Sequence, residues 1–175
     1  PTPAQRNWLA WCQERKHNYP VLLPEYEATT GCINPYVFGA TLFKELADDE
    51  IVVTGDGTAC VTTFQVARLK PQQRLYSNSG SASMGYDLPA AIGAAVALGG
   101  AHRIICLAGD GSIQMNLQEL QTIVGYDLPI KIFVYNNQGY HSIRQTQRNF
   151  FPDNIVGCGV ESGLSFPDMG KLAYA

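Results

Sequence analysis

Four short apolar runs divide this chain, and most of them are rich in β-branched residues. Glycine, asparagine or polar residues follow each run, so each run fits a β-strand that ends in a turn. Runs with little polar alternation are typical of strands that are buried on both faces of a parallel sheet. The predicted strands are Ile51–Thr54, Leu75–Ser77, Arg103–Ala108 and Ile130–Tyr135.

Between these runs, apolar residues recur at helical spacing and predict helices that pack through one face. Asn34 suits a helix N-cap, and Pro35 suits the first helical turn. Strands that alternate with helices favour an α/β fold, here a three-layer α/β/α domain with a largely parallel sheet. The predicted helices are Gln5–His17, a helix from Pro35 with Phe38, Leu42 and Leu46 on one face, Met84–Leu98, and Ser112–Val124.

Two segments are expected to differ in role. Residues 1–30 combine one helix with the breakers Tyr19-Pro20 and Pro24, and we interpret them as a lead-in helix and linker from a preceding domain. Residues 31–175 are interpreted as the domain proper. The stretch from Phe166 begins like a helix, and the chain stops before that helix could finish. The domain is therefore expected to be truncated at its carboxyl end.

Composition narrows the classes of function. The 175 residues are 46% hydrophobic and carry a net charge of −3 without any basic run, which argues against a nucleic-acid partner. The polar amino end lacks the apolar core of a signal peptide, and the apolar stretch Leu88–Leu98 is too short for a membrane span. Five scattered cysteines form no Cys-x-x-Cys pair, which is typical of reduced thiols in a cytoplasmic protein.

The segment Gly109-Asp110-Gly111-Ser112 follows the third predicted strand and suits a metal-bound phosphate. Its glycines allow a tight turn and a close approach of the backbone to a ligand. The amino end of the following helix would direct free N–H groups at an anion, and Ser112 adds a hydroxyl. The Asp110 carboxylate is a hard oxygen donor that suits Mg²⁺. A plain helix N-cap is the competing interpretation of Asp110.

The segment Asn136-Asn137-Gln138-Gly139 follows the fourth predicted strand. An amide oxygen and a backbone carbonyl could complete an oxygen-rich Mg²⁺ shell without added charge, whereas a simple turn is the competing interpretation. Only one helix and one strand separate this segment from Asp110. Because ligands bind at the carboxyl ends of strands in open α/β sheets, the two strand ends are expected to lie side by side.

Together these elements resemble a known family. Gly-Asp-Gly-Ser, one helix, one strand and then Asn-Asn is similar to the thiamine diphosphate motif of the pyruvate decarboxylase and acetolactate synthase superfamily. The segment from Gly80 to Ala94, GSASMGYDLPAAIGA, and the segment Ile143–Gln147, IRQTQ, also resemble that family. The similarity runs from about Asn34 to Pro152. It implies the thiamine diphosphate-binding fold and the cofactors thiamine diphosphate and Mg²⁺.

The resemblance also implies roles for individual residues. Asp110, the Asn137 side chain and the Gly139 carbonyl would bind Mg²⁺. The diphosphate would be held by Gly109, Gly111, Ser112 and the backbone near Tyr140. Met84 and the Ala82 carbonyl would contact the cofactor rings, with Gly57 and Thr58 near the distal phosphate. His141 and Gln145 could face the substrate.

The implied activity is decarboxylation of a 2-oxo acid with carboligation, and its difficult chemistry belongs to the cofactor. In this family the essential glutamate lies in a pyrimidine-binding domain of the same or a partner subunit, and the parent is expected to be a homodimer or homotetramer. No glutamate of this chain suits that role, so the chain alone is expected to be inactive. Two positions depart from acetolactate synthases: Gly57-Thr58-Ala59 replaces a Gln-His segment, and Thr146 replaces a tryptophan that helps to select the second keto acid.

Three other functions stay open at this point. A nicotinamide-dependent dehydrogenase fits the α/β pattern, but no Gly-x-Gly-x-x-Gly follows a strand. A non-catalytic binding or regulatory homologue would keep the fold without turnover. A simple 2-oxo acid decarboxylase would use the same cofactor without carboligation, and the fold does not decide between these chemistries.

Overall fold

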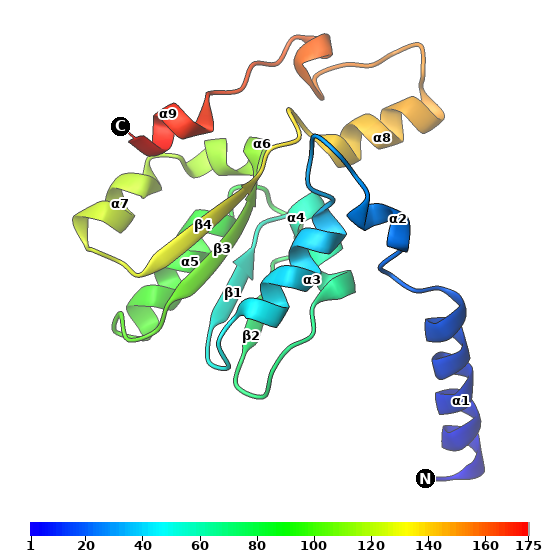
Figure 1. The fold of residues 1–175 in the computed structure, drawn as a ribbon. Coiled ribbons are helices and arrows are strands. Elements are labelled where there is room, and N and C mark those ends of the chain that lie inside the picture. The colour runs from blue at the N-terminus through cyan, green and yellow to red at the C-terminus, as the bar shows by residue number, and fades with distance from the viewer. Residues whose placement is uncertain (175) are drawn as a thin grey trace.

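The computed structural model describes residues 1–174 and contains a four-stranded, all-parallel sheet with the strand order β2-β1-β3-β4 (Figure 1). The four strands confirm the four predicted apolar runs, with bounds that shift by one residue at most at either end. They are β1 (Ile51–Thr54), β2 (Arg74–Tyr76), β3 (Ile104–Gly109) and β4 (Ile130–Tyr135).

Helices cover both faces of the sheet, which confirms the predicted α/β/α arrangement (Figure 1). Alternate strand residues point to opposite faces, as the pleat requires. Val53 and Cys106 pack with α5 (Asp87–Ala97) and α7 (Glu119–Gly125), whereas Val52 and Ile105 pack with α3 (Pro35–Glu45) and α4 (Thr58–Val66). The central strands β1 and β3 are thus buried between two apolar layers, which position the ends of these strands.

The amino-terminal segment extends away from the sheet (Figure 1). Helix α1 (Pro3–Asn18) confirms the predicted first helix, and a capping box between Thr2 and Gln5 starts it. None of its residues is buried, and Trp8 stacks on Trp11 at 5.1 Å between ring centroids on its exposed surface. The short helix α2 (Pro24–Glu27) then leads to α3. The first helix therefore contributes little to the core.

Several helices differ from the sequence-based expectation. The predicted helix Met84–Leu98 starts only at Asp87, because Gly85 has a φ of +81° that no right-handed helix accommodates. The predicted helix Ser112–Val124 is broken into α6 (Asp110–Ile113), η1 (Gln114–Asn116) and α7. Three helices were not predicted: α4, α8 (His141–Phe150) and the short α2, which begins at the expected breaker Pro24. Short elements η2 (Val160–Ser162) and α9 (Met169–Tyr174) follow, the latter within the stretch that began like a helix.

Within residues 1–174, no helix combines the length and the apolar character that crossing a membrane would require.

Asn34 caps helix α3 as predicted, since its side-chain oxygen accepts from the Tyr36 N–H at 2.9 Å. We expect Asn34→Ala to lower the free energy of unfolding by about 1 kcal/mol, because one N–H at the helix start loses its partner. Urea unfolding measures the change. Asn34→Ser, which keeps an acceptor, should recover most of the loss, and equal stability of all three proteins would contradict the capping role.

Candidate functional site

The two strand ends that the sequence singled out lie side by side. Strands β3 and β4 are parallel neighbours in register, with Gly109 opposite Tyr135. The chain then turns at both strand ends, and the Gly139 N–H donates to Asp110 Oδ2 at 3.1 Å. The expected juxtaposition of the Asp110 segment with the 136–139 loop is therefore confirmed.

Asp110 is a buried carboxylate, with 1% of its surface exposed. Burial raises the pKa of Asp110, and hydrogen bonds from the backbone around it, Gly139 first, lower that pKa only in part. No Lys, Arg or His forms an ion pair with it among the described residues. Beside it, the Asn137 Oδ1 atom is buried without a hydrogen-bond partner in the protein. The Asn137 oxygen thus lacks the hydrogen-bond partner that burial normally demands, and the Asp110 carboxylate lacks a cation to offset its charge.

The 136–139 loop is held in a conformation that only glycine adopts easily. Gly139 has a φ of +144°, and a Cβ built on it would lie 2.3 Å from the Cys158 carbonyl oxygen. The same carbonyl accepts from the Tyr140 N–H at 2.9 Å, and Gly139 forms an antiparallel bridge with Gly159. The segment around Cys158 therefore holds Gly139 and Tyr140 in place through backbone contacts.

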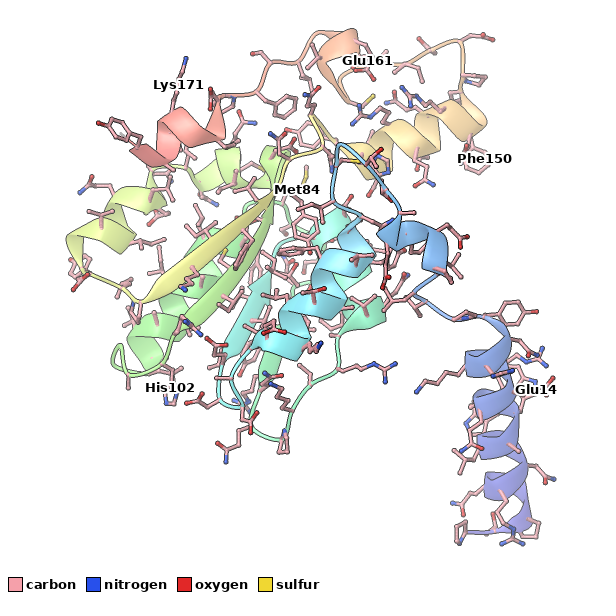
Figure 2. All side chains as sticks on the ribbon, in the orientation of Figure 1. Glu14, Met84, His102, Phe150, Glu161 and Lys171 are labelled. Atoms are coloured by element: carbon pink, nitrogen blue, oxygen red, sulfur yellow. The ribbon has the colours of Figure 1, made fainter. Side chains whose placement is uncertain are left out.

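A hollow of about 270 Å³ opens at this edge of the sheet. Every predicted site residue except Gln145 lines it, together with three residues that were not singled out. Figure 2 shows Met84 near the strand ends at this edge. The lining residues are Asp56, Gly57, Thr58, Ala82, Met84, Gly109, Asp110, Gly111, Ser112, Asn137, Gly139, Tyr140, His141, Ser142 and Ile143.

The hollow lies almost entirely within the part of the chain that a known family model matches. The family model described as "Thiamine pyrophosphate enzyme, C-terminal TPP binding domain" matches residues 57–175, which include every residue that lines the hollow except Asp56. The chain belongs to this family of thiamine pyrophosphate enzymes. The family's description implies thiamine pyrophosphate, also called thiamine diphosphate, as the ligand of the domain. The suspected resemblance is therefore confirmed.

Curated relatives agree with the family assignment. The chain is 34% identical to the acetolactate synthase large subunit of Parasynechococcus marenigrum over 98% of its length, and 37% identical to that of Porphyra purpurea over 99%. It is 38% identical to the acetolactate synthase isozyme 2 large subunit of Escherichia coli over 79% of its length. These matches cover 26%, 28% and 25% of the relatives, so the chain spans about a quarter of their length.

The described residues fit a diphosphate that is held through a divalent cation. Among them, no group of three or more His, Cys, Asp or Glu side chains could hold a metal ion. A cation here would thus need the Asp110 carboxylate with amide, carbonyl and ligand oxygens, a set that suits Mg²⁺ rather than Zn²⁺.

Two residues of the hollow use their polar atoms differently from the sequence-based interpretation. The Ser112 hydroxyl donates its proton to Asp87 Oδ2 at 2.5 Å and accepts from the Gly85 N–H at 2.8 Å. Its backbone, rather than its hydroxyl, is left to contact a phosphate. Helix α6 has only four residues, so its dipole is smaller than that of the long helix expected after Gly111. The Tyr140 N–H donates to the Cys158 carbonyl oxygen, and the Tyr140 ring packs over Gly111.

The candidate substrate residues lie on α8, outside the strand ends. His141 and Gln145 are both exposed, and only His141 lines the hollow. Thr146 also lies exposed on α8, and its hydroxyl donates to the Ser142 carbonyl oxygen at 3.0 Å. The structure thus leaves Gln145 apart from the group that it brings together.

Sequence reasoning did not single out Asp87 or the Cys158 segment. Asp87 is fully buried and bonds Ser112, and Cys158 supports the Gly139 turn. A carboxylate between Tyr86 and Leu88, at the start of an apolar helix, was the available signal for Asp87. No local pattern pointed to Cys158, because its role depends on a backbone carbonyl.

Proposed function

We propose that this chain is the thiamine diphosphate- and Mg²⁺-binding domain of an acetolactate synthase-like enzyme that acts on 2-oxo acids by decarboxylation with carboligation. The observation that carries the proposal is the pairing of the buried Asp110 carboxylate with the unpartnered Asn137 amide oxygen at one end of the sheet. The family match and the acetolactate synthase relatives support it.

The residues of the hollow divide into two groups in this proposal. Asp110, the Asn137 side chain and the Gly139 carbonyl would hold Mg²⁺. The backbone of Gly111 and Ser112 would hold the diphosphate. Gly57 supports a further phosphate contact, because its φ of +99° and its open surroundings leave the start of α4 accessible. Gly109 and the backbone near Tyr140 complete this end of the hollow.

The other end of the hollow would receive the organic part of the cofactor. Met84 is half-buried there and offers a polarisable apolar surface beneath the rings. Ala82 has a φ of +52°, and its carbonyl would accept from the exocyclic amine. The bound cofactor supplies an electron sink for breaking the bond next to the 2-oxo group, while the protein binds and orients both partners.

The proposal requires a second protein part. None of the described residues that line the hollow is a glutamate, so the acid that the resemblance demands must come from elsewhere. We propose that a pyrimidine-binding domain of the same or a partner subunit supplies it, within a homodimer or homotetramer. His141 lines the hollow, is exposed, and is the candidate on this chain to meet a 2-oxo acid.

Calorimetry with thiamine diphosphate and Mg²⁺ tests the proposal. We expect the longer polypeptide that carries the pyrimidine-binding domain to bind the cofactor tightly and to turn over pyruvate. The 175-residue chain alone should bind weakly or not at all, because half of the pocket is missing, and it should show no turnover. Turnover by the chain alone would contradict the requirement for a second domain. Absence of cofactor binding by the longer polypeptide would contradict the proposed function. Acetaldehyde in place of acetolactate as the product would favour a simple decarboxylase.

A further inference from the structure

A second buried carboxylate lies behind the hollow. Asp87, the first residue of α5, is fully buried, and its Oδ1 atom accepts from the Leu88 N–H at 3.0 Å. Its Oδ2 atom accepts the Ser112 hydroxyl proton at 2.5 Å. Burial raises the pKa of Asp87, and the Ser112 hydrogen bond lowers it only in part. No cation pairs with Asp87 among residues 1–174, so only its hydrogen bonds offset the cost of burying this carboxylate.

Those hydrogen bonds continue to the Gly85 peptide groups. The Ser112 oxygen accepts from the Gly85 N–H at 2.8 Å, and the Asn116 side-chain amide donates to the Gly85 carbonyl at 2.5 Å. Gly85 has a φ of +81°, and a Cβ on it would lie 2.8 Å from the Asn116 amide nitrogen. Both polar groups of Gly85 are therefore held by side chains of residues 112–116, a segment that starts at the end of the proposed diphosphate loop (residues 109–112).

The end of strand β1 closes around the same carboxylate. A Cβ built on Gly55 would lie 2.1 Å from Asp87 Oδ2, so the missing side chain of Gly55 makes room for the acid. The Gly55 N–H donates to the Leu107 carbonyl of β3 at 3.0 Å. Asp87 thus lies where the ends of β1 and β3 and the start of α5 meet. A shift of its side chain would therefore disturb the packing of all three elements.

We propose that Asp87 is a positioning residue that, through Ser112 and Gly85, fixes the Ala82–Met84 segment against the diphosphate loop. The inference rests on the proposed function and deepens it, because Asp87 would fix the distance between the Met84 end and the diphosphate end of the hollow. Met84 directly precedes the held Gly85, and Ser112 directly follows Gly111. A rigid link between them would preset the cofactor-binding shape before the ligand arrives.

Binding of two ligands of different length separates this role from a merely structural one. Inorganic pyrophosphate reaches only the metal and diphosphate end, whereas thiamine diphosphate also needs the Met84 end. In the longer polypeptide at saturating Mg²⁺, we expect Asp87→Asn and Ser112→Ala each to weaken thiamine diphosphate about tenfold, the effect of losing a hydrogen bond to a charged group. Pyrophosphate affinity should stay within about twofold of the wild-type value. The double variant should bind thiamine diphosphate no more weakly than the weaker-binding single variant, because the two residues act in one chain of hydrogen bonds.

Glu50→Gln is the matched control. Glu50 is a carboxylate with 3% of its surface exposed, and it pairs with Arg103 just before β1, at the opposite end of the strands from the hollow. Its replacement should lower the melting temperature without changing the affinity ratio of the two ligands. A parallel loss of both ligands in the Asp87→Asn protein, or no loss of either, would overturn the positioning role.

Amide hydrogen exchange at Gly85 decides the same point without any ligand. The Gly85 amide should exchange slowly in the wild-type protein and at least about tenfold faster in Asp87→Asn and Ser112→Ala. Unchanged exchange in both variants would overturn the inference. If the wild-type protein bound neither ligand, the proposed function would fail, and the exchange data would still decide whether Asp87 holds the Met84 segment.

Discussion

Replacing Asp110 with alanine is expected to weaken Mg²⁺-dependent binding of thiamine diphosphate at least ~100-fold in the longer polypeptide. Loss of an outer partner of a metal ligand already costs about 10- to 100-fold in metal affinity, so loss of a ligand should reach the upper end of that range. The Asp110 carboxylate accepts from the Gly139 N–H, and the neighbouring oxygens of Asn137 carry no charge to replace it. Calorimetric titration with and without Mg²⁺ measures the loss.

Stability distinguishes a lost ligand from a damaged fold in this experiment. Because burial raises the pKa of Asp110, its ionised form is unfavourable in the metal-free protein. The isosteric Asp110→Asn protein should thus melt at the same temperature as the wild type or higher, while it also loses cofactor. Asp153→Ala, at an exposed carboxylate, should leave both properties unchanged. Full cofactor binding by the Asp110 variants would contradict the metal assignment.

Replacing Gly139 with alanine is expected to lower the free energy of unfolding by at least ~3 kcal/mol and to remove cofactor binding. A non-glycine residue at a φ of +144° is strained by about 1–3 kcal/mol. The added Cβ would also lie 2.3 Å from the Cys158 carbonyl oxygen, so the turn must open. Opening the turn moves the Gly139 N–H away from Asp110 and the neighbouring Asn137 away from the metal. Denaturant unfolding and calorimetry measure the two effects.

Gly157→Ala is the matched control for this substitution. Gly157 also has a positive φ, of +58°, but no atom lies within 4 Å of a Cβ built on it. Its replacement should lower the free energy of unfolding by only ~1 kcal/mol, the penalty of a left-handed conformation for a non-glycine residue. Cofactor binding should be retained. Equal effects of the two substitutions would show that backbone strain, and not the contact with Cys158, governs the Gly139 turn.

Local sequence patterns were sufficient for the strands but not for every helix. The apolar runs at β1, β3 and β4 are short, continuous and bounded by turn residues, so they could be read directly. Helix α4 was not predicted because five of its nine residues are Thr or Val, which favour helix weakly, and burial of Ala59 and Val66 against the core stabilises it instead. Helix α8 was not predicted because it has few apolar residues, and none of its residues is buried; Ile143 and Phe150 are both exposed.

The broken helix after Asp110 shows where local patterns mislead. Ile113, Leu117, Leu120 and Val124 are spaced for one continuous helix, yet the chain bends between α6 and α7. The Asn116 side chain donates to the Gly85 carbonyl in the bend, and this contact joins segments 31 residues apart. Periodicity records which residues are apolar, but it does not record a polar contact with a distant loop.

The sequence by itself determined the strand positions, the α/β alternation and the two motifs whose strand ends meet at the site. These features follow from apolar runs, turn residues and topology, which act over a few neighbouring residues or through a general rule for parallel sheets. Only the tertiary structure decided that the Ser112 proton belongs to Asp87, that Cys158 supports Gly139, and that Gln145 lies outside the hollow. The physical reason is that hydrogen bonds and close packing join residues far apart in the chain, and their geometry exists only once the backbone has folded.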